Sequence, residues 1–399
     1  MSEKRKDNKG RILRTGESQR KDLIYQYRYT DIRGKRQTVY SSDLKELREK
    51  EKEIQKQLDD GIDYTAGKIT VIQLLERYIS LKQGVRYNTK VGYNFVLNLI
   101  KKEDFGYRQI RDVKVSDAQK WIMKLHSDGK GYSTITSVRG VVKPAFQMAY
   151  NEDIIRRNPF DFKLVEVVPN DSQKRIAMTD EQQKIWMNFI REDKTYCKYY
   201  DEFVVLLGTG MRVSEFCGLT KSDLDFENRR IRVDHQLVRE RGGKYYVEKT
   251  KTECGIRFIP MTDDVYQSLK NILANRRKMK TEIIVDGYSG FILIDKDCHP
   301  KVALHIENEM RWAMKKYKKL HPEQPLPHIT PHVFRHTFCT NMANKGMDIK
   351  TLQYLMGHSD VGVTLNVYTH ASYDRAVEQM VKIVDLSEQR GKFAACSGI

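Results

Sequence analysis

The chain has 399 residues, 40% of them hydrophobic and 31% charged, which is enough apolar sequence for the cores of two or three domains. Its 71 Lys and Arg exceed its 53 Asp and Glu and give a net charge of +18, which favours a polyanionic partner, nucleic acid first and an anionic membrane surface second. No apolar run approaches the ~20 residues that a spanning helix needs, and the N-terminus lacks the apolar core of a secretory signal. We therefore expect a cytoplasmic protein with no membrane partner.

Metal and cofactor sites are not indicated by the sequence. It contains no P-loop and no cluster of acidic residues at metal-ligand spacing, and its cysteines are scattered singly without a Cys-x-x-Cys pair. We expect no cofactor, no zinc site and no disulfide framework. The six cysteines are Cys197, Cys217, Cys254, Cys298, Cys339 and Cys396.

The first 40 residues are strongly basic, with twelve Lys and Arg against five Asp and Glu. Tyr25, Tyr27 and Tyr29 alternate along one of the strand-like runs and so share a face of the predicted sheet. A helix beginning near Asp43 carries an apolar stripe, and residues 1–62 therefore predict a sheet packed on one helix. The tyrosine face is expected against the helix, and the alternative is that it meets DNA. The strand-like runs are residues 11–17, 23–29 and 35–40.

Residues 68–158, after a linker at 61–67, predict a compact bundle of about four helices. The helical runs begin at Thr70, Asn88, Ser116 and Ser133. Thr70 and Gln73 form a capping box, and Pro144 is a candidate kink in the last helix. Basic residues on polar positions would suit one side of a duplex, although a solvated surface is the simpler interpretation of any single one. They are Lys82, Arg86, Lys90, Lys130, Arg139 and Lys143.

Residues 176–387 form the third predicted unit, after a polar linker, and open with a helix capped by Thr179 and Gln182. Residues 203–220 read as an apolar helix, a break at Gly208 and Gly210, and a second short helix. Arg212 lies just after the break. Glu215, one turn further on, is its candidate ion-pair partner.

Three strand-like runs follow, at residues 229–238, 244–251 and 255–260, and predict a three-stranded antiparallel sheet. Lys251 lies where the second strand meets its turn. A lysine at a hairpin tip is usually only solvated, and Lys249 competes with it for any functional role.

The densest set of polar candidates lies in residues 330–370. Thr330 followed by Pro331 marks a helix start. His332 and Arg335 lie three residues apart near that start, where free backbone N–H groups and the helix dipole favour an anion such as phosphate.

This helix should end near Gly346, and a second should run from Asp348 to Gly357. His358 follows immediately, on a backbone that the helix end would fix. Tyr368 comes ten residues later. A tyrosine hydroxyl has a pKa near ~10, so as a nucleophile it needs a base or a cluster of positive charge nearby.

The runs H-V-F-R-H-T-F-C-T, L-M-G-H-S and T-L-N-V-Y-T-H resemble the second signature of the tyrosine recombinases, the integrases of phages and mobile elements. Residues 203–220 resemble the first signature. The basic sheet domain at the N-terminus resembles most of all that of the integrases of conjugative transposons, with the integrases of temperate phages as the alternative, and implies integration and excision of such an element. The resemblance implies an arm-type DNA-binding domain at 1–62, a core-binding domain at 68–158, a catalytic domain at 176–387 and a polar tail at 388–399. The implied fold is multidomain and mainly α-helical with small antiparallel β-sheets.

The resemblance also implies the roles of six residues. Arg212 and Arg335 would bind the scissile phosphate with His358 as a further donor, and His332 would act as general acid and base. Lys251, favoured over Lys249 by its spacing to Pro260, would protonate the departing 5′ oxygen, and Tyr368 would attack. A 3′-phosphotyrosine intermediate, exchange of double-stranded DNA within a tetramer and an excision accessory protein are further implications.

Two other functions remain open at this point. A type IB topoisomerase would use the same groups to relax DNA, but the three-part arrangement argues against it. A non-catalytic DNA-binding regulator would be expected to have lost at least one of the six residues, and all six are present. A helix expected near residues 377–384 would either close its own domain or dock on a neighbouring protomer.

Overall fold

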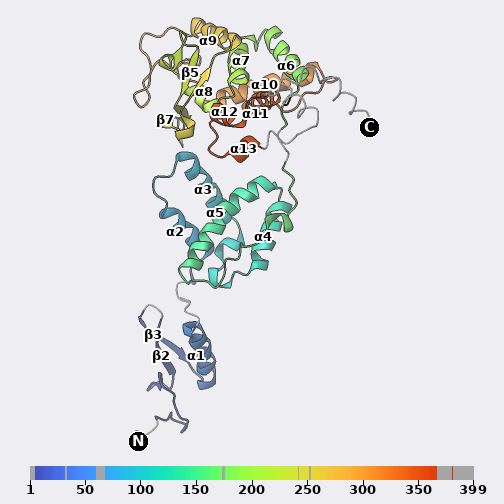
Figure 1. Cartoon of the computed structure of the whole chain (residues 1–399). Coiled ribbons are helices and arrows are strands. Elements are labelled where there is room, and N and C mark those ends of the chain that lie inside the picture. Colours follow the sequence, from blue (N-terminus) through green and yellow to red (C-terminus); the bar gives the residue numbers. More distant parts are fainter. Residues whose placement is uncertain are drawn as a thin grey trace. The chain divides into compact units, whose positions relative to one another are not determined.

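The structure is a computed structural model, which describes residues 5–31, 34–59, 68–172, 176–240, 242–250, 253–365 and residue 380. The chain divides into two compact units, residues 1–173 and 174–399 (Figure 1). Among the described residues, no helix has both the length and the apolar character needed to cross a bilayer.

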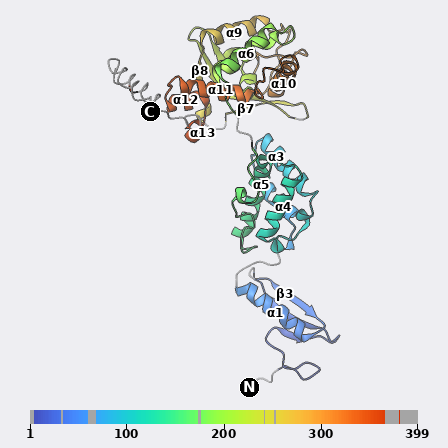
Figure 2. The same cartoon turned by 90° about the vertical axis from the view of Figure 1, so that its right-hand side faces the viewer.

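The N-terminal part of the first unit is an antiparallel sheet in the order β1-β2-β3, with α1 packed on it (Figure 2). Tyr25 and Tyr27 are buried in one cluster with apolar residues of α1, which confirms that the tyrosine face packs on the helix. The first strand lies later than the predicted 11–17: Ile12 forms only an isolated bridge with Lys6, a turn follows at residues 15–16, and β1 begins at Glu17. The elements are β1 (Glu17–Gln19), β2 (Tyr25–Thr30), β3 (Arg36–Ser41) and α1 (Leu44–Asp59).

The rest of the first unit is a helical bundle around a single apolar core. Phe105 stacks on Trp121 with ring centroids 4.6 Å apart, and Phe160 meets both rings edge-on. The capping box at Thr70 is present as predicted. The third helix begins before the predicted Ser116, because the Asp117 carboxylate accepts a hydrogen bond from the backbone of residue 114. The helices are α2 (Val71–Ser80), α3 (Tyr87–Ile100), α4 (Val115–Ser127) and α5 (Tyr132–Asn151).

The second unit combines helices with two small antiparallel sheets. Its core contains Trp186, Phe203 and Phe334, and α7 packs against both α9 and α11. Helices α9 and α10 are not among the elements predicted from the sequence. The helices are α6 (Asp180–Glu192), α7 (Tyr200–Thr209), α8 (Val213–Gly218), α9 (Asp263–Asn275), α10 (Ala303–Leu320), α11 (Pro331–Asn344), α12 (Ile349–Met356) and α13 (Val361–Leu365).

The prediction of one three-stranded sheet over residues 229–260 is wrong. The first predicted strand is interrupted at Asp234, so its two halves belong to different sheets. The first half lies in the sheet β4-β5-β8, and the second half forms the hairpin β6-β7, in which His235 pairs with Lys249. The strands are β4 (Leu224–Asp225), β5 (Arg230–Val233), β6 (His235–Arg239), β7 (Tyr245–Lys249) and β8 (Arg257–Pro260).

Candidate active site

Arg212 is placed by the turn between α7 and α8. Gly210, not the predicted pair of glycines, ends α7. Its φ is 63°, and a Cβ at this position would lie 2.3 Å from the ring of Phe338. The Arg212 guanidinium donates hydrogen bonds to Glu215 Oε1 at 2.7 Å and to the Gly357 carbonyl at 3.1 Å. Its side chain is still 37% exposed, so it is fixed by the protein while remaining open to a ligand.

Glu215 is buried between two arginines. Its Oε1 lies 2.7 Å from Arg212 Nη1, which confirms the expected ion pair, and its Oε2 lies 2.7 Å from Arg257 Nη2. Burial alone would raise the pKa of this carboxyl, but the positive charges of Arg257, Arg212 and Arg335 outweigh burial and lower the pKa to about 2. Glu215 is therefore ionised at neutral pH.

Arg335 lies on α11, which begins with Pro331 after the capping hydroxyl of Thr330, as predicted. Its guanidinium donates to the carbonyl of Gly210 at 2.7 Å and to the carbonyl of Met356. Burial, followed by the positive charge of Arg212, lowers the pKa of Arg335 to about 9. The group remains charged at pH 7.

His358 follows the left-handed residue Gly357 at the end of α12, as predicted. Its backbone is held at both ends by Gln353, which accepts from the His358 N–H at 3.2 Å and donates to the His358 carbonyl at 3.0 Å. The ring Nδ1 lies 3.0 Å from Thr364 Oγ1. Burial and the charges of Arg335 and Arg212 lower the pKa of the imidazole to about 4, so the ring is neutral at pH 7.

Each arginine of this cluster donates hydrogen bonds to backbone carbonyls at or near a helix end. Arg335 donates to carbonyls at the ends of α7 and α12, Arg212 to the carbonyl of Gly357, and Arg257 Nε to the carbonyl of Leu355 at 2.7 Å. The last carbonyls of a helix have no partner within the helix, and they carry its negative end. They position the guanidinium groups without cancelling their net positive charge.

The structure brings Arg212, Arg335 and His358 together. The other predicted site residues are either exposed or lie outside the described residues. His332 lies exposed on the first turn of α11, whereas Arg335 is buried. Lys251 and Tyr368 lie outside the described residues. The competing candidate Lys249 ends β7 and is exposed.

Arg257 is a member of the cluster that the sequence analysis missed. Residues alternate between buried and exposed along β8, and this alternation places Arg257 on the same inner face as Ile259. The sequence feature that could have revealed Arg257 is an arginine at an inward-facing position of a short apolar strand. It indicates a buried charge, which needs a partner nearby.

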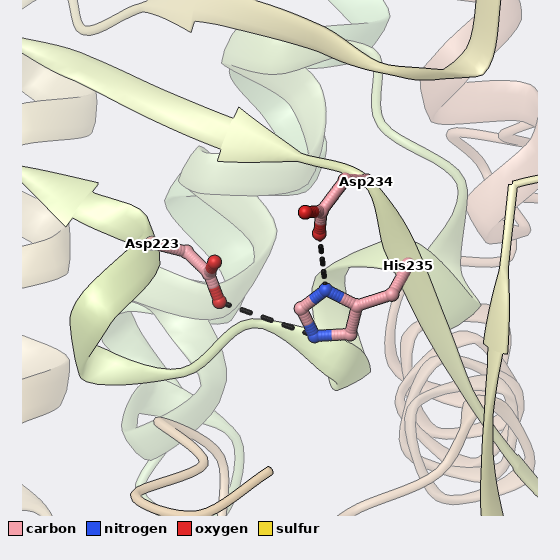
Figure 3. A group of neighbouring side chains, drawn as sticks. All are labelled: Asp223, Asp234 and His235. Atoms are coloured by element: carbon pink, nitrogen blue, oxygen red, sulfur yellow. Dashed lines mark hydrogen bonds and ion pairs between the residues drawn. The ribbon is translucent and has the colours of Figure 1, made fainter. Parts of the chain in front are cut away.

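A second polar cluster lies at the junction of β5 and β6 (Figure 3). Both ring nitrogens of His235 face oxygen atoms: Nδ1 faces the Asp234 carboxylate and Nε2 lies 2.8 Å from the carbonyl of Gly218. Asp223, 3.9 Å from the ring, already accepts two hydrogen bonds from Thr220, at 2.8 and 2.6 Å. The cluster links Gly218, Thr220 and the junction of β5 and β6 through contacts within the protein, so we assign it the structural role of fixing the junction between the two sheets.

Comparison with known proteins agrees with this geometry. Residues 177–375 match the model of the phage integrase family, and residues 1–58 match that of the DNA-binding domain of Tn916 integrase. The transposase from transposon Tn916 of Enterococcus faecalis is 45% identical over 396 residues, which cover 96% of this chain and 97% of that protein. This chain belongs to the phage integrase family of tyrosine recombinases.

Solved structures of related proteins have the same fold as this chain. The Tn1549 transposon integrase in complex with transposon right end DNA matches with a TM-score of 0.75 and 42% identity, over 79% of this chain and 100% of that one. A lambda integrase tetramer bound to a Holliday junction shares the fold, with a TM-score of 0.53 and 17% identity over 88% of this chain and 94% of that one. The expected class of enzyme, its likeness to integrases of conjugative transposons and its mainly helical, multidomain fold are confirmed.

Proposed function

We propose that this integrase cuts and rejoins double-stranded DNA through a 3′-phosphotyrosine intermediate, and thereby integrates and excises a conjugative transposon. One observation carries the proposal. Arg212 and Arg335 donate to the adjacent carbonyls of Gly357 and Met356, so their guanidinium groups are held side by side, with His358 following in the chain.

Two neighbouring guanidinium groups repel each other, and a phosphodiester placed between them relieves that repulsion. Arginine forks bind phosphate oxygens in pairs and stay charged at any relevant pH. When the phosphorus is attacked, negative charge grows on those oxygens, and donors that are already in position stabilise it. The arginines are already positioned in the folded chain, so these side chains reorganise little during the reaction.

The chemical steps follow from the types of the remaining residues. The Tyr368 oxygen attacks phosphorus, and its proton passes to His332 as the general base. The bond from phosphorus to the 5′ oxygen breaks, and Lys251 gives that oxygen a proton. The products are a 3′-phosphotyrosine and a free 5′-hydroxyl. A 5′-hydroxyl from another strand then reverses the reaction and releases the tyrosine.

The proposed partners follow from the same chemistry. Two duplexes present four strands, each of which needs a nucleophile, so we propose a tetramer assembled on DNA. We propose residues 1–62 as the arm-type domain, 68–158 as the core-binding domain and 176–387 as the catalytic domain. The net charge of +18 supports phosphate contacts along this length. Action in the bacterial cytoplasm and an accessory protein for excision complete the proposal.

A suicide substrate tests the function directly. Duplexes that cover the two ends of the DNA element carrying the gene are nicked just 3′ to each candidate cleavage site, so that the short 5′-hydroxyl fragment diffuses away and traps the covalent complex. The full chain should form a protein–DNA adduct that resists denaturation.

Two tyrosine variants decide the chemistry. Tyr368→Phe should bind the same DNA and form no adduct, whereas Tyr373→Phe, at the next tyrosine along the sequence, should form adduct normally. Loss of the adduct in the second variant alone would show that the nucleophile is misassigned. Binding without any adduct in the wild-type chain would refute the recombinase mechanism.

A further inference from the structure

Arg257 is enclosed on all sides, and its contacts span three segments of the second unit. The side chain has no exposed surface. Its Nη2 lies 2.7 Å from Glu215 Oε2, its Nη1 donates to the carbonyl of Gly255 at 3.0 Å, and its Nε donates to the carbonyl of Leu355 at 2.7 Å. These partners lie on α8, on the turn that precedes β8, and at the end of α12.

This enclosure excludes a direct contact between Arg257 and DNA. A Cβ on Gly357 would already lie 2.9 Å from Arg257 Nη1, so no room for a phosphate exists on that side. Glu215, which is itself 3% exposed, also lies against the guanidinium, 2.7 Å from its Nη2. Arg257 must therefore act through its neighbours.

Stability does not by itself require an ion pair at this place, although the loss of one partner alone would be costly. A buried ion pair gains little over well-packed apolar side chains of similar volume, because both charges must give up their hydration. The pair instead fixes the orientation of the side chains that contact it. Arg257 donates to Glu215 Oε2 through Nη2 at 2.7 Å and to Oε1 through Nη1 at 3.4 Å, and Oε1 also accepts from Arg212 Nη1 at 2.7 Å. A fixed Arg257 therefore holds the plane of the carboxylate and with it the Arg212 guanidinium.

The same side chain joins the turn before β8 to the helix end that carries His358. Gly255 belongs to the turn Glu253–Gly255, which leads into β8. Leu355 lies in the last turn of α12, three residues before His358. A guanidinium can serve these two carbonyls and a carboxylate together because its donors diverge in one plane, whereas a lysine has a single nitrogen.

We propose that Arg257 is a positioning residue for strand cleavage: it orients Arg212 through Glu215 and ties the turn before β8 to the helix end that carries His358. This inference rests on the proposed recombinase function. It predicts that a change at Arg257 slows the chemical step in correctly folded molecules that still bind DNA.

The test compares Arg257→Lys with Arg276→Lys in the full chain. Arg276 is the matched control: its side chain is 5% exposed, and it donates to the carbonyl of Phe291 at 2.7 Å and to Glu282 at 2.6 Å, outside the cluster. Single-turnover cleavage of the nicked duplex at saturating protein gives two quantities. The amplitude measures the fraction of active molecules, and the rate constant measures their chemistry.

Arg257→Lys is expected to lower the rate constant about 10- to 100-fold at unchanged amplitude and DNA affinity, because a misplacement of ~1 Å costs on this order. Arg276→Lys is expected to keep the wild-type rate constant. A purely structural role predicts lower amplitude at an unchanged rate constant, or equal slowing in both variants, and either result overturns the proposal.

Glu215→Asp tests the same coupling without touching Arg257, and it carries the test if Arg257→Lys does not fold. It keeps every charge but draws the carboxylate back by one methylene, so its rate constant should also fall at full amplitude. Because both changes break one linkage, the double variant should be no slower than the slower single one. A full rate in Glu215→Asp, or multiplied losses in the double variant, overturns the positioning role.

The two proposals fail in different ways. A wild-type chain that binds the duplex and forms no adduct overturns the recombinase mechanism and the positioning role with it. A wild-type adduct together with an unaffected Arg257→Lys overturns the positioning role alone.

Discussion

Replacing Glu215 by glutamine should destabilise the second unit by about 3 kcal/mol at pH 7. The folded structure lowers the pKa of this carboxyl from 4.5 to about 2, which corresponds to about 3 kcal/mol of favourable interaction for the ionised form. An independent expectation agrees, since removing one member of a buried ion pair costs roughly 3–5 kcal/mol. Glutamine keeps the volume of the side chain and leaves Arg257 buried without an anion.

The stability difference between wild type and Glu215→Gln should depend on pH. The pKa of Glu215 is lower in the folded chain than the unfolded value of 4.5, so its contribution is complete above that pH. The contribution is lost as the pH falls from 4.5 to about 2. The stability difference between wild type and Glu215→Gln should therefore be largest at neutral pH and shrink through this window.

Urea unfolding followed by tryptophan fluorescence can measure this difference in the full chain. The chain has three tryptophans, and in a Trp121→Phe background the remaining two, Trp186 and Trp312, both lie in the second unit and report on it alone. A difference below ~1 kcal/mol at pH 7 would refute the argument, because a buried pair broken on one side costs more than that. A difference that stays constant down to pH 3 would show that charge is not its cause.

Three further predictions concern neighbouring positions. Gly210→Ala should destabilise the second unit by at least ~1 kcal/mol, because of its φ of 63° and the Phe338 ring 2.3 Å from the added Cβ; Gly140→Ala, in a helix with open space around it, should leave the chain as stable or more so, and urea titrations compare the two. The His358 imidazole should titrate near pH 4 in the free chain, and its pKa should rise when DNA binds because a phosphate favours the charged ring, as NMR titration would show; an unchanged value in the complex would place the phosphate elsewhere. Arg335→Lys should slow single-turnover cleavage by ~10²–10³-fold at nearly unchanged DNA affinity, because one nitrogen cannot replace the fork; near-normal cleavage would remove Arg335 from the mechanism.

The features that the sequence predicted well are local. The caps at Thr70, Thr179, Thr330 and Asp348 are all present, because each depends on a hydrogen bond to a backbone N–H three residues away. The left-handed Gly357 and the ion pair of Arg212 with Glu215 are equally local. Two short signatures were therefore enough to predict where Arg212, Arg335 and His358 lie on their elements.

The features that were missed depend on contacts between distant residues. Arg257 and Glu215 are far apart in sequence, and only the fold shows that one carboxylate serves both Arg257 and Arg212. The interruption at Asp234 depends likewise on the carbonyl of Gly218, which receives the buried ring of His235. Alternation along residues 229–238 is the same for one long strand as for two short strands of different sheets, so the pattern could not separate them.

The carbonyls that hold the arginines have a consequence for how such chains change during evolution. Arg335 joins the end of α7 to the end of α12, and Arg257 reaches the carbonyl of Leu355 one residue earlier. Loss of either arginine would leave buried carbonyls without donors, at a cost of ~1–3 kcal/mol each. A descendant that had abandoned DNA cleavage would therefore still gain from keeping both arginines. Their retention would record the needs of the fold. Under the proposed mechanism, the fate of Tyr368 and Lys251 would be the better record of whether the chain still cuts DNA.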